Sequence, residues 1–102
     1  MIALKRVLPY PEIYVRAVAL DMVESLSNDA TVNKNQWQLI ATVNVYGNES
    51  YVSINIAKSD TNHSVLCINM LTPAPTLSAE GQSRVLSFLA DGMEQLLENT
   101  FA

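Results

Sequence analysis

The spacing of apolar residues predicts two amphipathic helices, one toward each end of the chain. From Glu12 to Leu26 the apolar positions follow the 3.6-residue period of a helix, at Val15, Val18, Ala19, Met22, Val23 and Leu26. Pro11 suits the first turn, where a helix leaves the backbone N–H unbonded. A second stripe lies between Ser78 and about Glu98, at Val85, Leu86, Leu89, Met93, Leu96 and Leu97. Each helix therefore has one side that must be buried.

Between the helices the apolar period changes from 3.6 residues to two, which is the period of a half-buried strand. Residues 36–45 alternate in this way, with Trp37, Leu39, Ala41, Val43 and Val45 on one side. After a turn predicted at residues 47–50 the alternation resumes, which predicts a hairpin, and a third strand follows over residues 64–71. A shorter alternation around Lys5 and Arg6 predicts a strand over residues 2–8, with its charge opposite its apolar side.

Polar and proline-rich segments separate these elements. Residues 27–35 are predicted to form a loop, residues 59–62 a turn and residues 72–76 a stiff linker. The element order β-α-β-β-β-α predicts an α+β fold, an antiparallel sheet of three to four strands with two helices packed on one face. At 102 residues, the chain is the size of one domain, 1–102.

A sheet covered by helices on one face leaves its other face without a cover. That face would carry Thr42, Asn44, Tyr46, Tyr51, Ser53, Asn55, Val65, Cys67 and Asn69. Neutral polar groups mixed with apolar ones are typical of a contact surface. We therefore predict that a protein partner or a second copy, in a homodimer, binds at Tyr46, Tyr51, Asn55, Val65 and Cys67.

The charge of the chain narrows the classes of partner. Six Lys and Arg against ten Asp and Glu give a net charge of −4, which disfavours nucleic acid and anionic membranes. Double-stranded-RNA-binding domains share the order α-β-β-β-α, but their last helix begins with lysines, whereas this one carries Glu80. The N-terminal residues do not follow the order of a secretory signal, and the single cysteine agrees with a reducing compartment. We expect a cytoplasmic protein.

Few residues offer catalytic or metal chemistry. One cysteine and one histidine exclude an internal disulfide and a Cys/His zinc site. His63 lies near Asp60 and Ser64, but a solvated histidine in a turn is the favoured interpretation, because a triad needs a shaped pocket. Cys67 on a strand is better explained as a small apolar side chain than as a nucleophile. We predict no catalytic, metal or cofactor residues.

Acidic residues gather near the end of the final helix, at Asp91, Glu94 and Glu98. Negative charge at a helix C-terminus opposes the helix dipole by about 0.3–1 kcal/mol. A basic partner would relieve this repulsion, so these three residues join the candidate partner-binding set. The alternative is that they only solvate the helix surface.

These features lead to two hypotheses for function. The first is a small non-enzymatic protein-interaction module, adaptor, chaperone-like or inhibitor-like, acting through the sheet face or the C-terminal helix. The alternative is a domain that binds a small apolar ligand, or is weakly catalytic, with a pocket between the sheet and that helix. Such a pocket would be lined by Trp37, Leu39, Met70, Phe88 and Met93, residues that would otherwise fill a core.

Overall fold

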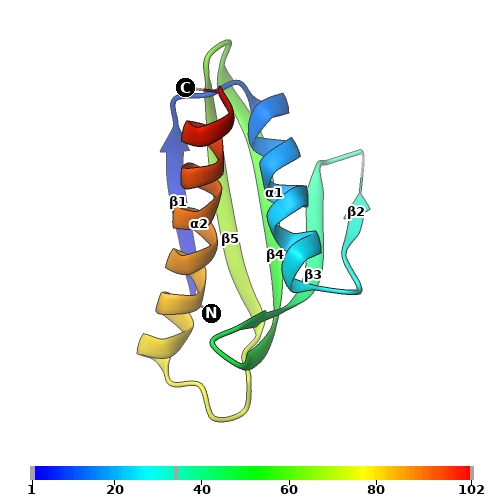
Figure 1. Ribbon diagram of the computed structural model, residues 1–102, viewed down its shortest axis with the longest axis vertical. Coiled ribbons are helices and arrows are strands. Elements are labelled where there is room, and N and C mark those ends of the chain that lie inside the picture. Colours follow the sequence, from blue (N-terminus) through cyan, green and yellow to red (C-terminus); the bar gives the residue numbers. More distant parts are fainter. Residues whose placement is uncertain (1, 34, 102) are drawn as a thin grey trace.

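The computed structural model describes residues 2–33 and 35–101, and it confirms the predicted α+β class. The elements in chain order are β1 (Ala3–Leu8), α1 (Glu12–Leu26), β2 (Thr31–Asn33), β3 (Gln38–Val45), β4 (Asn48–Asp60), β5 (His63–Thr72) and α2 (Ala79–Phe101). The strands form one antiparallel sheet in the order β1-β5-β4-β3-β2. Both helices lie across the same face of this sheet (Figure 1).

The sheet has one strand more than the sequence predicts. Residues Thr31–Asn33, in the segment predicted as a loop, form β2 and pair with β3, where Val32 lies opposite Leu39. A strand with a single apolar residue between two polar ones shows no measurable period, so its pairing with β3 decides its structure. Position 34 of the same predicted loop lies outside the described residues.

The final helix begins as predicted and ends later. The Ser78 hydroxyl accepts a hydrogen bond from the Gly81 N–H at 3.1 Å, which caps the helix start. The helix continues past Glu98 to Phe101, whose ring stacks on that of Tyr14 with centroids 4.3 Å apart. This contact with α1 stabilises a last turn that the apolar stripe does not include.

The core fills the space between the sheet and the helices. Opposite residues in register put Leu4, Ile68, Ile54 and Leu39 in one row across four strands on the helix side. On β3, β4 and β5 the helix-facing apolar residues are at most 3% exposed. The two-residue period of the sequence thus identifies the buried face of each of these strands.

Asp29 links the loop after α1 to the edge of β3. Its carboxylate accepts a hydrogen bond from the Thr42 N–H at 2.8 Å and another from the Ser27 hydroxyl at 2.6 Å. The pairing of β2 with β3 ends at Ile40. Beyond that point the Thr42 N–H has no carbonyl of β2 to bond, and the Asp29 carboxylate accepts its hydrogen bond instead. These hydrogen bonds, that of Ser27 first, hold the pKa of Asp29 below its ordinary value of 3.8.

This lowered pKa predicts an acid-dependent loss of stability. A carboxylate whose folded pKa is depressed stabilises the fold above its unfolded pKa, and the stabilisation is lost as the pH falls through the folded pKa. We therefore expect Asp29→Asn to be less stable than the parent at pH 7, with the difference shrinking as the pH falls below 3.8. Urea unfolding at several pH values measures this. Asp21→Asn, at an exposed position of α1, is the matched control, and parallel pH curves for Asp29→Asn and the parent would contradict the assignment.

Candidate functional site

A groove of about 790 Å³ lies between the turn that joins β3 to β4 and the first half of α2. Its apolar wall is formed by Tyr46, Leu77, Val85 and Phe88. Its polar rim includes Glu80, Arg84 and Asp91. A hollow of this size is within the range of small-ligand sites, about 300–1,000 Å³.

The turn beside the groove differs from the one the sequence predicts at residues 47–50. Tyr46 and Gly47 are its two central residues, with φ of 56° and 78°, and β4 begins directly at Asn48. Positive φ at both positions is the geometry of a mirror-image hairpin turn, which matches the twist of the strands. Tyrosine rarely adopts it, because a left-handed conformation costs a residue with a side chain about 1–2 kcal/mol.

The strained Tyr46 places an aromatic ring against α2. Its ring meets that of Phe88 edge-to-face, with centroids 5.3 Å apart and an interplanar angle of 64°. Phe88 is half-buried, whereas Tyr46 is 72% exposed. Tyr46 therefore lies on the helix side of the sheet and not on the open face, where the sequence places it. Backbone strain of this kind gathers at functional sites.

The charges around the groove are balanced within the chain. The Arg84 guanidinium donates to the Glu80 carboxylate at 2.7 Å, one helical turn away. Arg6 reaches from β1 to Asp91 at 2.7 Å and to Glu94 at 3.4 Å. The hydrogen bond to Asp91 and the two negative charges raise the pKa of Arg6 above its ordinary value.

The position of Arg6 corrects one prediction. It pairs in register with Leu66 and so lies on the helix side, together with Leu4 and Leu8, and not opposite them. From there the Arg6 guanidinium places a positive charge beside Asp91 and Glu94. This is the kind of charge that the sequence predicts a partner would supply. The third acid, Glu98, is exposed. Partner binding by these three acids stays a prediction.

The pocket predicted between the sheet and α2 is filled by side chains. Leu39, Met70 and Met93 are 0–2% exposed and belong to the core. Trp37 and Phe88 are half-buried and line two separate hollows. The groove beside Phe88 instead opens along the outer side of α2, and the periodicity of the strands gives no signal for it.

Four of the predicted partner-binding residues lie on the open face of the sheet, away from the helices. Asn55 and Cys67 are opposite each other in register, and Lys5 completes their row on β1. Tyr51 is 40% exposed, and Val65 and Cys67 are half-buried. The structure thus brings these side chains to one surface, and their role in partner binding stays a prediction.

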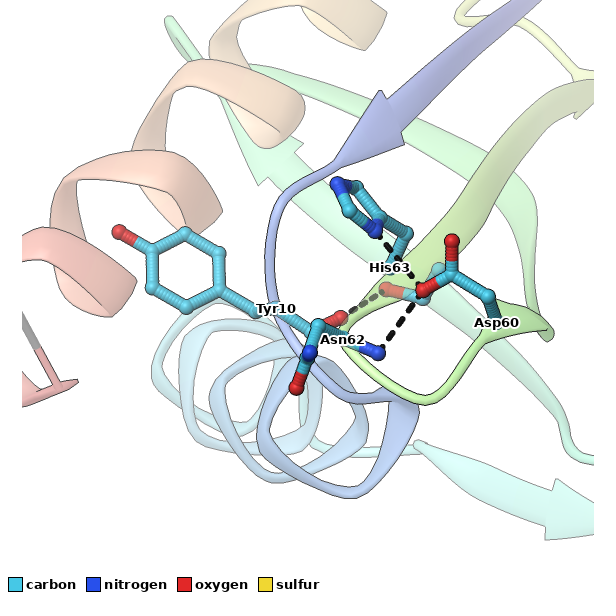
Figure 2. A network of polar contacts seen from close by, with 5 residues as sticks. Tyr10, Asp60, Asn62 and His63 are labelled. Atoms are coloured by element: carbon cyan, nitrogen blue, oxygen red, sulfur yellow. Dashed lines mark hydrogen bonds and ion pairs between the residues drawn. The ribbon is translucent and has the colours of Figure 1, made fainter.

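The residues around His63 do not assemble into a triad. Nδ1 of His63 lies 2.8 Å from Oδ1 of Asp60, which also accepts the Asn62 N–H at 2.9 Å (Figure 2). The Ser64 hydroxyl is fully buried and donates to the Tyr10 carbonyl at 3.0 Å. Neighbouring strand residues point to opposite faces, so the serine turns away from the imidazole. The His63 contact lowers the pKa of Asp60 in an exposed turn.

Residues 2–33 and 35–101 hold no group of three or more His, Cys, Asp or Glu side chains placed to bind a metal ion. Within the same ranges, neither helix is long and apolar enough to cross a membrane.

Comparison with solved structures shows a likeness in fold. No family model and no curated protein matches the chain. A solved structure of a START superfamily protein from Mycobacterium smegmatis is similar over 96% of this chain and 97% of its own, with a TM-score of 0.60 and 10% sequence identity. At that identity the likeness shows the fold alone.

This likeness corrects the first functional hypothesis. The sequence favours a protein-interaction module, and the likeness counts against that hypothesis; the alternative, a domain that binds a small apolar ligand, is the one that we propose below. A mixed polar and apolar sheet face and an acidic helix are compatible with either hypothesis, because surface composition alone does not identify what a domain binds.

Proposed function

We propose that this chain is a small binding domain that holds an apolar or amphipathic molecule in the groove between the Tyr46-Gly47 turn and α2. The START-like fold supports this proposal, because it is a fold associated with hydrophobic ligands. The observation that carries it is the pair of rings, Tyr46 and Phe88, held beside a hollow of about 790 Å³ at the cost of a left-handed tyrosine.

The lining of the groove supports a ligand with an apolar body and a polar end. Leu77 and Val85 extend the wall formed by the two rings. At the rim, Arg84 pairs with Glu80 and Asp91 pairs with Arg6, so each charged group there already has a partner within the chain. An apolar ligand buried there gains about 25 cal/mol for each Å² of apolar surface removed from water.

A fluorescent apolar dye tests this proposal. Nile red should bind the parent protein saturably, with an increase in emission. Phe88→Ala should weaken that binding about fivefold to tenfold, equivalent to about 1–1.4 kcal/mol, because half of the aromatic wall is removed. Phe101→Ala is the matched control, because Phe101 is an aromatic residue of the same helix at its far end, stacked on Tyr14.

Tyr46→Asn separates binding from folding. Asn-Gly is the preferred pair for this type of turn, so the variant should unfold at the same urea concentration as the parent or a higher one. Its affinity for Nile red should nevertheless fall as it does in Phe88→Ala. Equal dye affinity in the parent, Phe88→Ala and Tyr46→Asn would refute the groove as the binding site.

A binding role, and not a catalytic one, is part of the proposal. The START-like fold is compatible with it. Two further expectations from the sequence stay predictions, a cytoplasmic location and a homodimer formed through the open sheet face. Light scattering after size-exclusion chromatography, on the parent and on Val65→Lys, tests the second.

A further inference from the structure

A second cavity, of about 320 Å³, lies where β3 begins, and it shares no residue with the groove beside Tyr46. Arg16 of α1 and Trp37 form one side of it, and Asn55 of β4 borders it. The pairing of β3 with β4 begins at Gln38 and Asn55, and β4 continues beyond that point, as Figure 1 shows. The cavity therefore occupies the corner between the protruding part of β4 and α1.

The cavity contains the positively charged guanidinium of Arg16, which is held in place but has hydrogen-bond donors without a partner. The Arg16 guanidinium carbon lies 5.9 Å from the centroid of the Trp37 ring, within the range of a cation–π contact. One of its nitrogens, Nη2, donates to the Glu12 carboxylate at 3.2 Å. Its Nε is buried and has no hydrogen-bond partner among the described residues. A guanidinium has five N–H donors, so it retains the capacity to bind a further acceptor.

The rest of the lining is neutral and rich in primary amides. Gln36, Gln38 and Asn55 line the cavity, and none of their side chains forms a hydrogen bond within residues 2–33 and 35–101. None of the residues that line it is acidic. In a chain with a net charge of −4, this corner presents a cation beside groups that both donate and accept hydrogen bonds.

We propose that this cavity binds a small carboxylate that also carries hydroxyl groups. The planar guanidinium of Arg16 matches a carboxylate in two parallel hydrogen bonds, and the contact with the Trp37 ring fixes its position before the ligand arrives. The amides of Asn35 and Gln36, in the segment that precedes β3, then bind the hydroxyl groups. This site is independent of the apolar groove, and neither proposal requires the other.

Trp37 is the only tryptophan of the chain, so its fluorescence reports on this cavity alone. Galacturonate should change the Trp37 emission saturably in the millimolar range. Galactose tests the hydroxyl groups without the carboxylate, and inorganic phosphate tests an anion without the sugar hydroxyls. Neither should bind as tightly as galacturonate. No saturable change with galacturonate would overturn the proposal, and so would equal affinity for phosphate or for galactose.

Two variants shift the affinity in opposite directions. Arg16→Lys keeps the charge but lacks the planar pair of donors, so galacturonate should bind about tenfold more weakly. Glu12→Gln removes a carboxylate that competes for Nη2, so galacturonate should bind several-fold more tightly. Arg84→Gln is the matched control, because Arg84 forms the same kind of i,i+4 pair with Glu80 on α2.

Circular dichroism verifies that each variant is folded. If Arg16→Lys unfolds, Glu12→Gln still tests whether Arg16 binds the carboxylate. If Arg16 had only a structural role, loss of its partner Glu12 would not make galacturonate bind more tightly. Unchanged or weaker binding of galacturonate by Glu12→Gln would overturn the assignment of Arg16 as the carboxylate ligand.

Discussion

Replacing Met93 with alanine is expected to lower the free energy of unfolding by about 2–5 kcal/mol. Met93 is fully buried on the inner side of α2, in the cluster that contains Leu39 and Met70. Removing its side chain loses the free energy gained when the side chain is buried away from water. It also leaves a cavity that a packed core closes only in part. Urea unfolding followed by circular dichroism measures the loss, since one cooperative transition is expected of a domain of this size.

The size of this loss also distinguishes a packed interior from an internal binding pocket. Leu96→Ala is the control, because Leu96 lies on the same helix but is only half-buried, and it should cost clearly less. A loss below about 1 kcal/mol for Met93→Ala would mean that the side chain already borders open space. The ligand would then belong inside the fold, between the sheet and α2, and not in the groove beside Tyr46.

The helices and the long strands could be predicted because burial imposes a period on the sequence. A helix with one buried side repeats every 3.6 residues, and a strand with one buried face repeats every two. The run from Glu12 to Leu26 and the alternation from Leu39 to Val45 are long enough to show these periods. The short strand at Thr31–Asn33 is not, and only its partner strand makes it a strand.

The site was less predictable, because contacts between distant residues form it. Arg6 and Asp91 are 85 positions apart, and only the register that places β1 beside β5, beneath α2, brings their charges together. Extending the alternation of β3 through Tyr46 predicts that this residue lies on the open face. A left-handed backbone at that position turns its ring to Phe88 instead. The dipeptide Tyr-Gly between two strands was the available signal, since glycine at the second turn position favours a two-residue turn.

The START-like fold and the groove contribute different parts of the functional argument. The fold alone assigns no function, because unrelated ligands and functions can share one architecture. The proposed selectivity rests on the lining of the groove. Its aromatic rings would contact an apolar surface, and the ion pair of Glu80 with Arg84 at its rim would attract neither cations nor anions strongly. The Arg16 cavity has the opposite character, with an available cation and amides. The two hollows would therefore select different ligands on one small domain.

The contact between the two helices depends on the glycine at position 92. A glycine on a helix allows another part of the molecule to approach the helix closely. In the structure the side chain of Met22, on α1, occupies the space above it, and a Cβ at position 92 would overlap with the sulfur and terminal methyl of Met22. The close approach is therefore made by a flexible side chain and not by another backbone.

Gly92→Leu is accordingly expected to lower the free energy of unfolding by about 1–3 kcal/mol, because a branched side chain must displace Met22 and separate α1 from α2. Gly92→Ala should have a net effect near zero, because the end of Met22 can move and alanine improves helix propensity by about 1 kcal/mol. The double variant Gly92→Leu with Met22→Ala should recover more than half of the loss, since the leucine then fills the space that methionine leaves. Urea unfolding of the parent, both Gly92 variants, Met22→Ala and the double variant measures this coupling. Full stability in Gly92→Leu alone would show that the helices are not held at this distance by Gly92.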